Sequence, residues 1–126
     1  MYAKNIHNKQ ELISPTGMKN SLEYRPLEGF IFAITPFNFT SIAGNLPTAP
    51  AIMGNVSIWK PASSAVYACY FLMELLKEAG LPDGVINFLP GSGSTVGDPI
   101  LNHPSLAGVH FTGSTNTFNH IWKTIG

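Results

Sequence analysis

Apolar runs alternate with helical patterns along most of the chain. Four short runs end at proline, glycine or small polar residues, which is typical of buried strands. They cover residues 29–35, 56–59, 85–89 and 108–113. Helical patterns separate them and no hairpin signal appears after residue 30, so we expect a parallel sheet with right-handed crossovers. The predicted fold class is α/β, with helices flanking the sheet.

The strongest helical pattern runs from Ser63 to Ala79. Its apolar residues recur at spacings of three and four, which forms one stripe along a helix. Gly80 suits the position after the last helical residue, and Pro82 lies just beyond it. Weaker helical patterns cover residues 40–53, 94–101 and 114–125.

The pattern at residues 40–53 contains two prolines, Pro47 and Pro50. Proline lacks the backbone N–H that a helix interior needs, so we predict a kink or irregular turns here. Thr40 or Ser41 is the expected N-cap, and Gly54-Asn55 is the expected stop.

Residues 1–28 are polar and mixed, without a clear period. Ser14-Pro15-Thr16-Gly17 predicts a turn, and weak extended patterns cover Glu11–Ser14 and Leu22–Arg25. We interpret this region as a lead-in arm that packs on something outside the chain. The core is then expected in residues 29–126.

Composition narrows the function classes. Of 126 residues, 44% are hydrophobic and only 11% are charged, which indicates that much of the surface faces other protein. The net charge of zero supports neither nucleic-acid binding nor a polybasic membrane segment. No apolar run approaches the roughly 20 residues that span a bilayer, and residues 1–20 resemble no targeting segment. Cys69 is the single cysteine, which excludes an internal disulfide and points to a reducing compartment.

Two polar residues stand where predicted strands end. Asn38 follows the first strand after Pro36, and Lys60 ends the second. Ligands of open α/β folds bind at the carboxyl ends of parallel strands, so Asn38 is a candidate donor to an oxyanion. A simple turn residue is the alternative. Lys60 is a candidate for binding a phosphate or ribose hydroxyl, or it reaches solvent with its head.

Two glycine-containing turns join a strand to a helix. Gly91-x-Gly93-x-x-x-Gly97 allows backbone N–H groups to approach a nucleotide, although Val96 breaks the dinucleotide fingerprint and no Walker lysine follows. A tight turn without a ligand is equally compatible. In Phe111-Thr112-Gly113-Ser114-Thr115 a helix opens on small and hydroxyl residues that suit a phosphate. An ordinary Ser or Thr N-cap is the alternative.

The residues that usually act as nucleophiles or metal ligands do not fit such roles. Cys69 lies on the apolar stripe of the main helix, so a packed core thiol is expected. The four histidines, His7, His103, His110 and His120, have no metal-ligand spacing. Paired carboxylates are absent from the strand ends, which gives hydrolysis no support. The chain therefore has the residues of a binding site rather than those of a complete reactive centre.

Four motifs occur in an order and at spacings that resemble the aldehyde dehydrogenase superfamily. They are Thr35-Pro36-Phe37-Asn38-Phe39, Trp59-Lys60-Pro61-Ala62-Ser63, Gly80-Leu81-Pro82-x-Gly84-Val85-x-Asn87 and Phe111-Thr112-Gly113-Ser114-Thr115. Within the superfamily these motifs most resemble those of the L-glutamate γ-semialdehyde (Δ1-pyrroline-5-carboxylate) dehydrogenase branch. The most similar segments are Leu27-Glu28-Gly29-Phe30 and Thr117-Phe118. The resemblance covers about residues 24–126. It implies a partial Rossmann-like, NAD-binding domain over residues 29–126.

The resemblance implies a role for each matched position. Asn38 would stabilise the oxyanion of a thiohemiacetal, and Lys60 would bind the adenosine ribose. The other cofactor-binding positions would be Thr35, Pro36 and Phe37 beneath the cofactor, Gly93 and Gly97 at the adenine side, and Thr112, Gly113, Ser114, Thr115, Asn116 and Thr117 near the pyrophosphate. Ser63 stands where many members carry Glu, so NADP stays open as an alternative to NAD.

The same resemblance implies that the catalytic Cys and Glu lie beyond Gly126. We therefore expect a fragment that is inactive alone, taken from an enzyme that oxidises glutamate γ-semialdehyde to glutamate with NAD in proline breakdown. That enzyme would be a homo-oligomer acting on a small aldehyde, in the mitochondrial matrix of a eukaryote or the cytoplasm of a bacterium. The alternatives are a non-catalytic short form that binds a nucleotide or a partner, and an aldehyde dehydrogenase with another substrate.

Overall fold

The fold is a four-stranded parallel sheet between two layers of helices. A computed structural model describes residues 2–8 and 12–126. Its elements are α1 (Tyr2–Asn8), β1 (Phe30–Thr35), α2 (Thr40–Ile52), β2 (Val56–Pro61), η1 (Ser63–Ala65), α3 (Val66–Glu78), β3 (Ile86–Phe88), η2 (Gly93–Gly97), α4 (Asp98–Leu101), β4 (Leu106–Phe111) and α5 (Thr115–Ile125). The strand order is β3-β2-β1-β4. All three pairings are parallel, which confirms the predicted α/β class.

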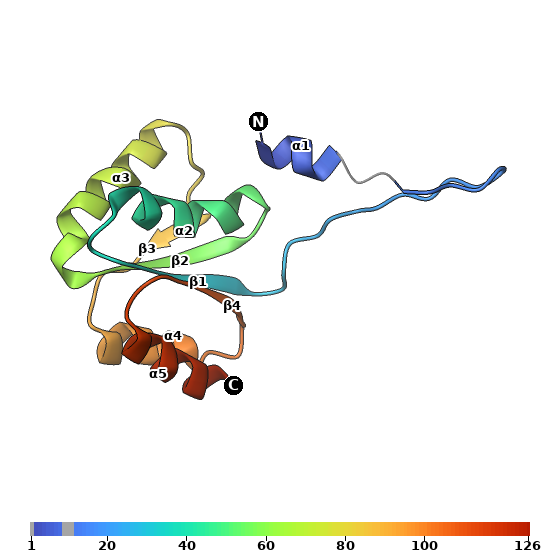
Figure 1. The fold of residues 1–126 in the computed structure, drawn as a ribbon. Coiled ribbons are helices and arrows are strands. Elements are labelled where there is room, and N and C mark those ends of the chain that lie inside the picture. Colours follow the sequence, from blue (N-terminus) through green and yellow to red (C-terminus); the bar gives the residue numbers. More distant parts are fainter. Residues whose placement is uncertain (1, 9–11) are drawn as a thin grey trace.

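Each face of the sheet has its own hydrophobic core. Helices α2 and α3 cover one face, and α4 and α5 cover the other (Figure 1). The first core is built around Trp59, with Ala43, Cys69, Met73 and Ile86. The second joins Phe32 to Leu101 of α4 and Ile121 of α5. Because neighbouring strand residues point to opposite faces, β2 contributes to both cores, through Trp59 and Ile58, and β1 contributes Phe32 to the second.

Helix α3 ends where the sequence predicts. Gly80 has a φ of 95°, a left-handed conformation that glycine adopts without steric cost. The Gly80 N–H donates to the Lys77 carbonyl and the Leu81 N–H to the Leu76 carbonyl, each at 2.9 Å. This pair of bonds is the Schellman motif, which satisfies carbonyls left free at a helix end.

We predicted either a kink or irregular turns at residues 40–53. The irregular turns were wrong, because α2 is helical from Thr40 to Ile52 with both prolines inside. Pro50 has no N–H to offer the Leu46 carbonyl one turn earlier. His110 of β4 replaces it, since its Nδ1 lies 2.9 Å from the Leu46 oxygen. A carbonyl only accepts, so Nδ1 carries the proton. A side chain from a distant strand thus supports the helix at its missing bond.

Several boundaries differ from the sequence prediction. The N-cap of α2 is Phe39, which offers no side-chain oxygen, rather than Thr40 or Ser41. Strand β2 continues to Pro61, which pairs with Thr35 of β1. The Ser57 N–H donates to the Val85 carbonyl and the Trp59 carbonyl accepts from the Leu89 N–H, both on the β3 side, whereas the Ala62 N–H donates to the Thr35 carbonyl. The backbone position of Pro61 is therefore directed to the side of β3. The pairing of β2 with β3 stops at Trp59, so no strand there requires an N–H from Pro61. The helix predicted from Ser94 is a π-helical turn, η2, followed by the four residues of α4.

The lead-in arm leaves the sheet as an extended segment that turns back on itself (Figure 1). The predicted turn is confirmed by a bond from the Met18 N–H to the Pro15 carbonyl at 3.0 Å. No strand forms within residues 12–28; Glu11, where one weak extended pattern begins, lies outside the described residues. The short helix α1 was not predicted. The arm joins the body where the Leu27 N–H donates to Asn55 Oδ1 at 2.8 Å.

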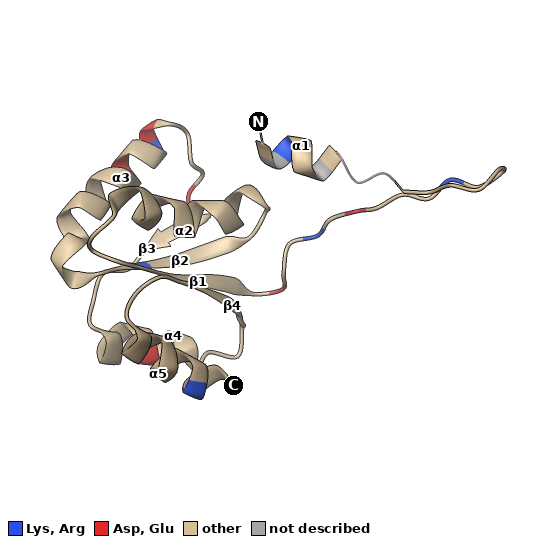
Figure 2. Cartoon of the chain, in the orientation of Figure 1, with Lys and Arg blue, Asp and Glu red and all other residues tan. Residues whose placement is uncertain are grey.

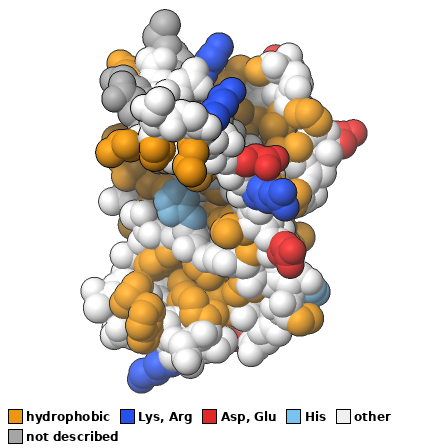
Figure 3. All heavy atoms as spheres, turned by 90° about the vertical axis from the view of Figure 1, so that its right-hand side faces the viewer, with side chains coloured by type: hydrophobic (Ala, Val, Ile, Leu, Met, Phe, Trp, Pro, Cys, Tyr) orange, Lys and Arg blue, Asp and Glu red, His pale blue; other side chains and the backbone are white. Residues whose placement is uncertain are grey.

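The surface is poor in charge and rich in apolar side chains. Figure 2 shows long uncharged stretches over the sheet and α2, and Figure 3 shows hydrophobic patches on the face turned toward the arm. Tyr67 and Phe71 of α3 are 77% and 54% exposed, and Trp122 of α5 is 64% exposed. Exposed apolar surface of this extent is typical of surfaces that contact other protein. Within the described residues, every helix is too short or too polar to cross a membrane.

Candidate functional site

A cleft opens at the carboxyl ends of β1, β2 and β4. Chain order reverses beside β1, since β2 and β3 lie on one side and β4 on the other. Open α/β sheets bind ligands at this kind of switch point. The cleft has a volume of about 450 Å³ and is lined by Ile34, Thr35, Pro36, Phe37, Asn38, Lys60, Ala62, Phe111, Thr112, Gly113, Ser114 and Thr117. Residues of three sequence motifs are thereby brought together.

The end of β1 combines a fixed residue with a free one. Thr35 is 2% exposed, and its hydroxyl accepts a bond from the Trp59 indole N–H at 2.9 Å. Its carbonyl accepts from the Ala62 N–H at 3.1 Å. Asn38, three residues later, is exposed and lines the cleft. Its amide makes no hydrogen bond with another described residue, so it remains able to donate to a ligand.

Lys60 is the only lysine or arginine among the residues that line the cleft. Lys60 is 8% exposed, and its Nζ makes one long contact, 3.5 Å, to the Pro61 carbonyl. Burial lowers the pKa of Lys60 because desolvation disfavours the charged amine. A buried cation with so few partners is suited to bind an anion or a set of hydroxyl groups.

The turn between β4 and α5 lines the cleft with Gly113 and Ser114 and leads into a helix start with free backbone donors. Ser114 caps α5, with its Oγ accepting from the Thr117 N–H at 3.2 Å. The cap leaves the N–H groups of Thr115 and Asn116 without partners inside the helix. A Cβ at Gly113 would lie 2.7 Å from the Phe111 ring, so a larger residue would force that ring to move. Glycine here lets the ring support a turn that suits a phosphate.

A second hollow, of about 350 Å³, lies beside the first between η2–α4 and α5. It is lined by Gly93, Ser94, Asp98, Asn116, Thr117 and His120. Its two walls have similar caps, because Ser92 Oγ accepts from the Thr95 N–H at 3.0 Å just as Ser114 accepts from Thr117. His120 Nε2 lies 2.7 Å from Asp98 Oδ1 and so joins the walls. Thr117 lines both hollows, which makes them neighbours.

The predicted site residues gather at these two hollows with few exceptions. Thr115 lines an adjoining depression with Phe118. Gly97 is buried within η2, and Ser63 is exposed in η1; neither lines a described hollow. The sequence reading missed Ser92, Asp98 and His120. Ser92 before a helical pattern was a usable signal, since serine is a preferred N-cap residue, whereas no local pattern pairs Asp98 with His120.

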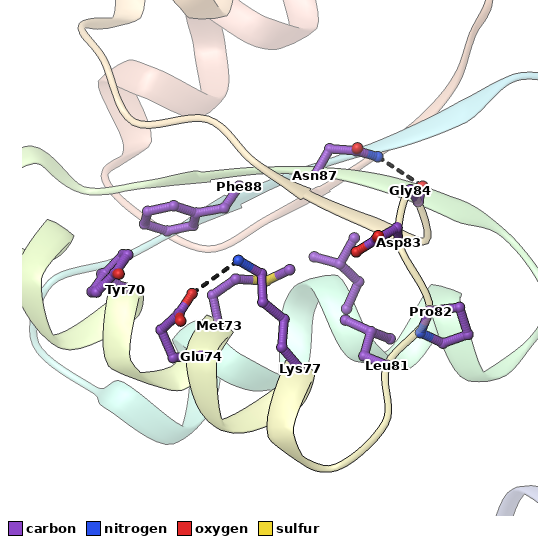
Figure 4. A pocket seen from close by; sticks show the side chains of 11 residues that line it. Tyr70, Met73, Glu74, Lys77, Leu81, Pro82, Asp83, Gly84, Asn87 and Phe88 are labelled. Atoms are coloured by element: carbon purple, nitrogen blue, oxygen red, sulfur yellow. Dashed lines mark hydrogen bonds and ion pairs between the residues drawn. The ribbon is translucent and has the colours of Figure 1, made fainter.

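A third groove, of about 330 Å³, lies at the other side of the sheet between α3 and β3. Figure 4 shows that Lys77 and Asn87, two of its polar side chains, each have a bonding partner. Lys77 Nζ lies 2.9 Å from Glu74 Oε1, and the Asn87 amide donates to the Gly84 carbonyl at 2.8 Å. Glu74 raises the pKa of Lys77 by hydrogen bonding and charge. This groove offers less free binding chemistry than the cleft at the switch point.

The described residues provide no evident nucleophile or metal centre at the cleft. Cys69 is buried in the α3 core, as predicted, and burial raises the pKa of its thiol. A raised pKa disfavours the reactive thiolate. No group of three His, Cys, Asp or Glu side chains comes together within the described part of the chain. The cleft can bind an anionic, hydroxyl-bearing ligand and direct one amide at it.

Comparison with known proteins agrees with this geometry. The model of the aldehyde dehydrogenase family matches residues 1–126. A probable delta-1-pyrroline-5-carboxylate dehydrogenase of Schizosaccharomyces pombe is 50% identical over 99% of this chain, and the mitochondrial enzyme of that name in Dictyostelium discoideum is 53% identical over 97%. The Delta-pyrroline-5-carboxylate dehydrogenase of Mycobacterium tuberculosis, solved with NAD bound, is 58% identical over 99% of the chain, with a TM-score of 0.94.

This chain spans less than a quarter of each of those relatives, 22% to 23% of their length. The match covers nearly the whole of this chain in sequence and, for the solved structure, in fold. The chain belongs to the aldehyde dehydrogenase family.

Proposed function

We propose that this chain forms the cofactor-binding part of an NAD-dependent dehydrogenase that oxidises L-glutamate γ-semialdehyde, the open form of Δ1-pyrroline-5-carboxylate, to L-glutamate. The observation that carries the proposal is the cleft itself. It brings Asn38, Lys60 and the Gly113-Ser114 turn together from three strand ends. Relatives named for this activity are about half identical to the chain.

The residues present fit a dinucleotide. Lys60 would bind the adenosine ribose, and the N–H groups at the start of α5 would bind the pyrophosphate. Gly93 at the second hollow leaves open space, since a Cβ there would meet no atom within 4 Å. We assign that hollow to the adenine. Bound NAD supplies the hydride acceptor of the oxidation.

Asn38 would bind the carbonyl oxygen of the aldehyde substrate rather than the cofactor. Nucleophilic attack on an aldehyde places negative charge on that oxygen, and a preorganised amide N–H stabilises it. Asn38 is suited to this role because its amide is free and α2 begins two residues later. The uncapped N–H groups of that helix add a favourable field for an anion. The nucleophile and the general base would come from elsewhere in a longer polypeptide.

Isothermal titration calorimetry of the 126-residue chain with NAD tests the proposal directly. We expect saturable binding that Lys60→Ala and Ser114→Ala weaken. Lys77→Ala is the matched control, because Lys77 is an exposed lysine in the groove beside β3. A folded chain that binds no NAD, or one that Lys77→Ala weakens as much as Lys60→Ala, would contradict the assignment.

Activity measurements on this chain and on a longer gene product together distinguish the alternatives. The isolated chain should bind NAD without forming NADH from Δ1-pyrroline-5-carboxylate, since its cysteine is a buried core thiol. A nucleotide-binding short form predicts this result as well. The dehydrogenase proposal and the short-form alternative differ in what they predict for a longer gene product. Only the dehydrogenase proposal expects that product to be active. Comparing glutamate γ-semialdehyde with other aldehydes on that product then tests the substrate, and comparing NAD with NADP tests the cofactor.

Assembly and location follow as further proposals. A homo-oligomer of the whole enzyme is supported by the exposed apolar side chains of α3 and α5. A mitochondrial matrix location in a eukaryote is supported by relatives whose names carry that compartment; in a bacterium the cytoplasm would be the counterpart. Size-exclusion chromatography of the gene product measures its oligomeric state, and imaging of the tagged gene product shows its location.

A further inference from the structure

We infer that the His120–Asp98 pair is a positioning pair that sets the distance between the two walls of the adenine hollow. This inference rests on the proposed nucleotide site. Asp98 belongs to one wall and His120 to the other, and both side chains line the hollow that they join. The 2.7 Å contact spans 22 positions of sequence, so it links separate elements rather than neighbouring turns.

The wall that carries Asp98 depends on contacts outside itself. Helix α4 has only four residues and follows the π-helical turn η2. A helix this short is not stable by its own hydrogen bonds. It is attached to α5 at two levels. Leu101 and Ile121 are buried together against the sheet, and Asp98 and His120 meet at the solvent side.

The two levels have different consequences for a ligand. Leu101 and Ile121 lie in the buried core outside the lining of the hollow, and they hold α4 to that core. The Asp98–His120 bond lies at the hollow itself, with side chains 42% and 58% exposed. Because the carboxylate only accepts, His120 Nε2 carries the proton in this bond. Without it the walls would stay attached at their base but gain freedom where the ligand enters.

The expected effect on binding is modest. Exposed charged pairs contribute little, so removing this one should weaken binding about threefold and at most about fivefold. The loss should be equal for AMP and for NAD, because both present adenosine to the hollow. It should occur without unfolding, since the core contact remains.

Calorimetry of the full chain with AMP and NAD tests the inference, using His120→Ala, Asp98→Ala and the double variant. We expect each single variant to lower the affinity for AMP and for NAD by the same factor. The double variant should bind no more weakly than either single variant. His120→Gln, which restores an N–H donor, should recover most of the affinity. Glu74→Ala, which breaks an exposed pair of similar length on α3, should change nothing. Circular dichroism confirms that each variant is folded.

Two results would overturn the inference while leaving the nucleotide site in place. One is wild-type affinity for AMP in both single variants. The other is an additive double variant that His120→Gln does not rescue, which would indicate independent direct contacts. If the folded wild-type chain binds neither AMP nor NAD, the proposed function fails and the inference fails with it.

Discussion

The cleft at the switch point and the groove beside β3 have comparable size but different chemistry. In the groove, Lys77 is held by Glu74 and the Asn87 amide by a backbone carbonyl (Figure 4). In the cleft, Lys60 has one long contact and Asn38 has no partner among the described residues. Each site therefore contains one lysine and one asparagine, and the difference is whether they are already satisfied. Free polar groups, rather than volume, distinguish a binding site here.

The largest expected difference is between the two asparagines. In the longer dehydrogenase that we propose, Asn38→Ala should lower kcat by about 10²–10³-fold, because one oxyanion donor is lost. Asn87→Ala should leave kcat unchanged, since that amide bonds to Gly84 and to nothing in the cleft. Steady-state kinetics with Δ1-pyrroline-5-carboxylate and NAD gives both values. Equal loss in the two variants would remove the distinction between the sites.

The two lysines should differ next. Lys60→Met keeps an unbranched apolar stem and removes the charge, so the affinity for NAD should fall about tenfold, the value of one hydrogen bond to a charged group. Lys77→Met should leave the affinity unchanged because Lys77 is outside the cleft. Calorimetry on both folded variants measures the ratio. A ratio near one would mean that Lys60 only reaches solvent.

Proton binding by Lys60 gives a related test. Burial lowers its pKa from the ordinary 10.5, so NAD affinity should fall as the pH rises through the lowered pKa and the amine becomes neutral. Stability should change in the opposite direction. Between the lowered pKa and 10.5 the unfolded chain holds a proton that the folded chain has released, so the free energy of unfolding rises with pH. Lys60→Met should abolish both trends, as followed by calorimetry and urea unfolding.

His110 provides a satisfied polar group that supports structure alone. His110→Phe should lower the free energy of unfolding by about 1–2 kcal/mol, because the Leu46 carbonyl loses its partner in a buried place. In a Pro50→Ala background the cost should be much smaller, since alanine returns a backbone N–H to that carbonyl. Urea denaturation of the four proteins measures the coupling. NAD affinity should be unaffected, and additive costs would disprove the coupling.

The smallest effect is expected at the exposed Glu74–Lys77 pair. Glu74→Gln removes the charge that raises the pKa of Lys77, so that pKa should move down toward 10.5. The raised pKa stabilises the fold below 10.5 and loses its effect as the pH rises through the folded value. The midpoint of thermal unfolding at neutral pH should barely change, because exposed pairs contribute little. NMR titration of Lys77 and a thermal melt give the two readings.

The sequence was informative wherever a local rule decided the structure. The end of β1 just before Pro36, the Gly80 cap and the placement of Asn38 and Lys60 at strand ends were all predicted from neighbouring residues. An ordinary Ser114 cap and a phosphate site were alternative predictions for one turn, and the structure combines the cap with free N–H groups there.

The misses share a different physical origin. Helix α2 continues through Pro50 because His110 lies 64 positions after Leu46 in the sequence and beside it in space. The Asp98–His120 pair likewise joins two helices that no local pattern relates. Pairing across the fold depends on the strand order, and β4 returning beside β1 was not fixed by hydrophobic periodicity. Tertiary contacts therefore decided what propensity alone left open.

The position of β1 between β2 and β4 also determines when the site can form during synthesis. Phe30 pairs with Val56 on one side and with Leu106 on the other, so β1 emerges from the ribosome long before its second neighbour. Contacts this distant in sequence form slowly because the intervening chain must be ordered first. A nascent chain that has not yet reached Phe111 has no complete cleft. Nucleotide can therefore stabilise the finished sheet by mass action but cannot template its early stages.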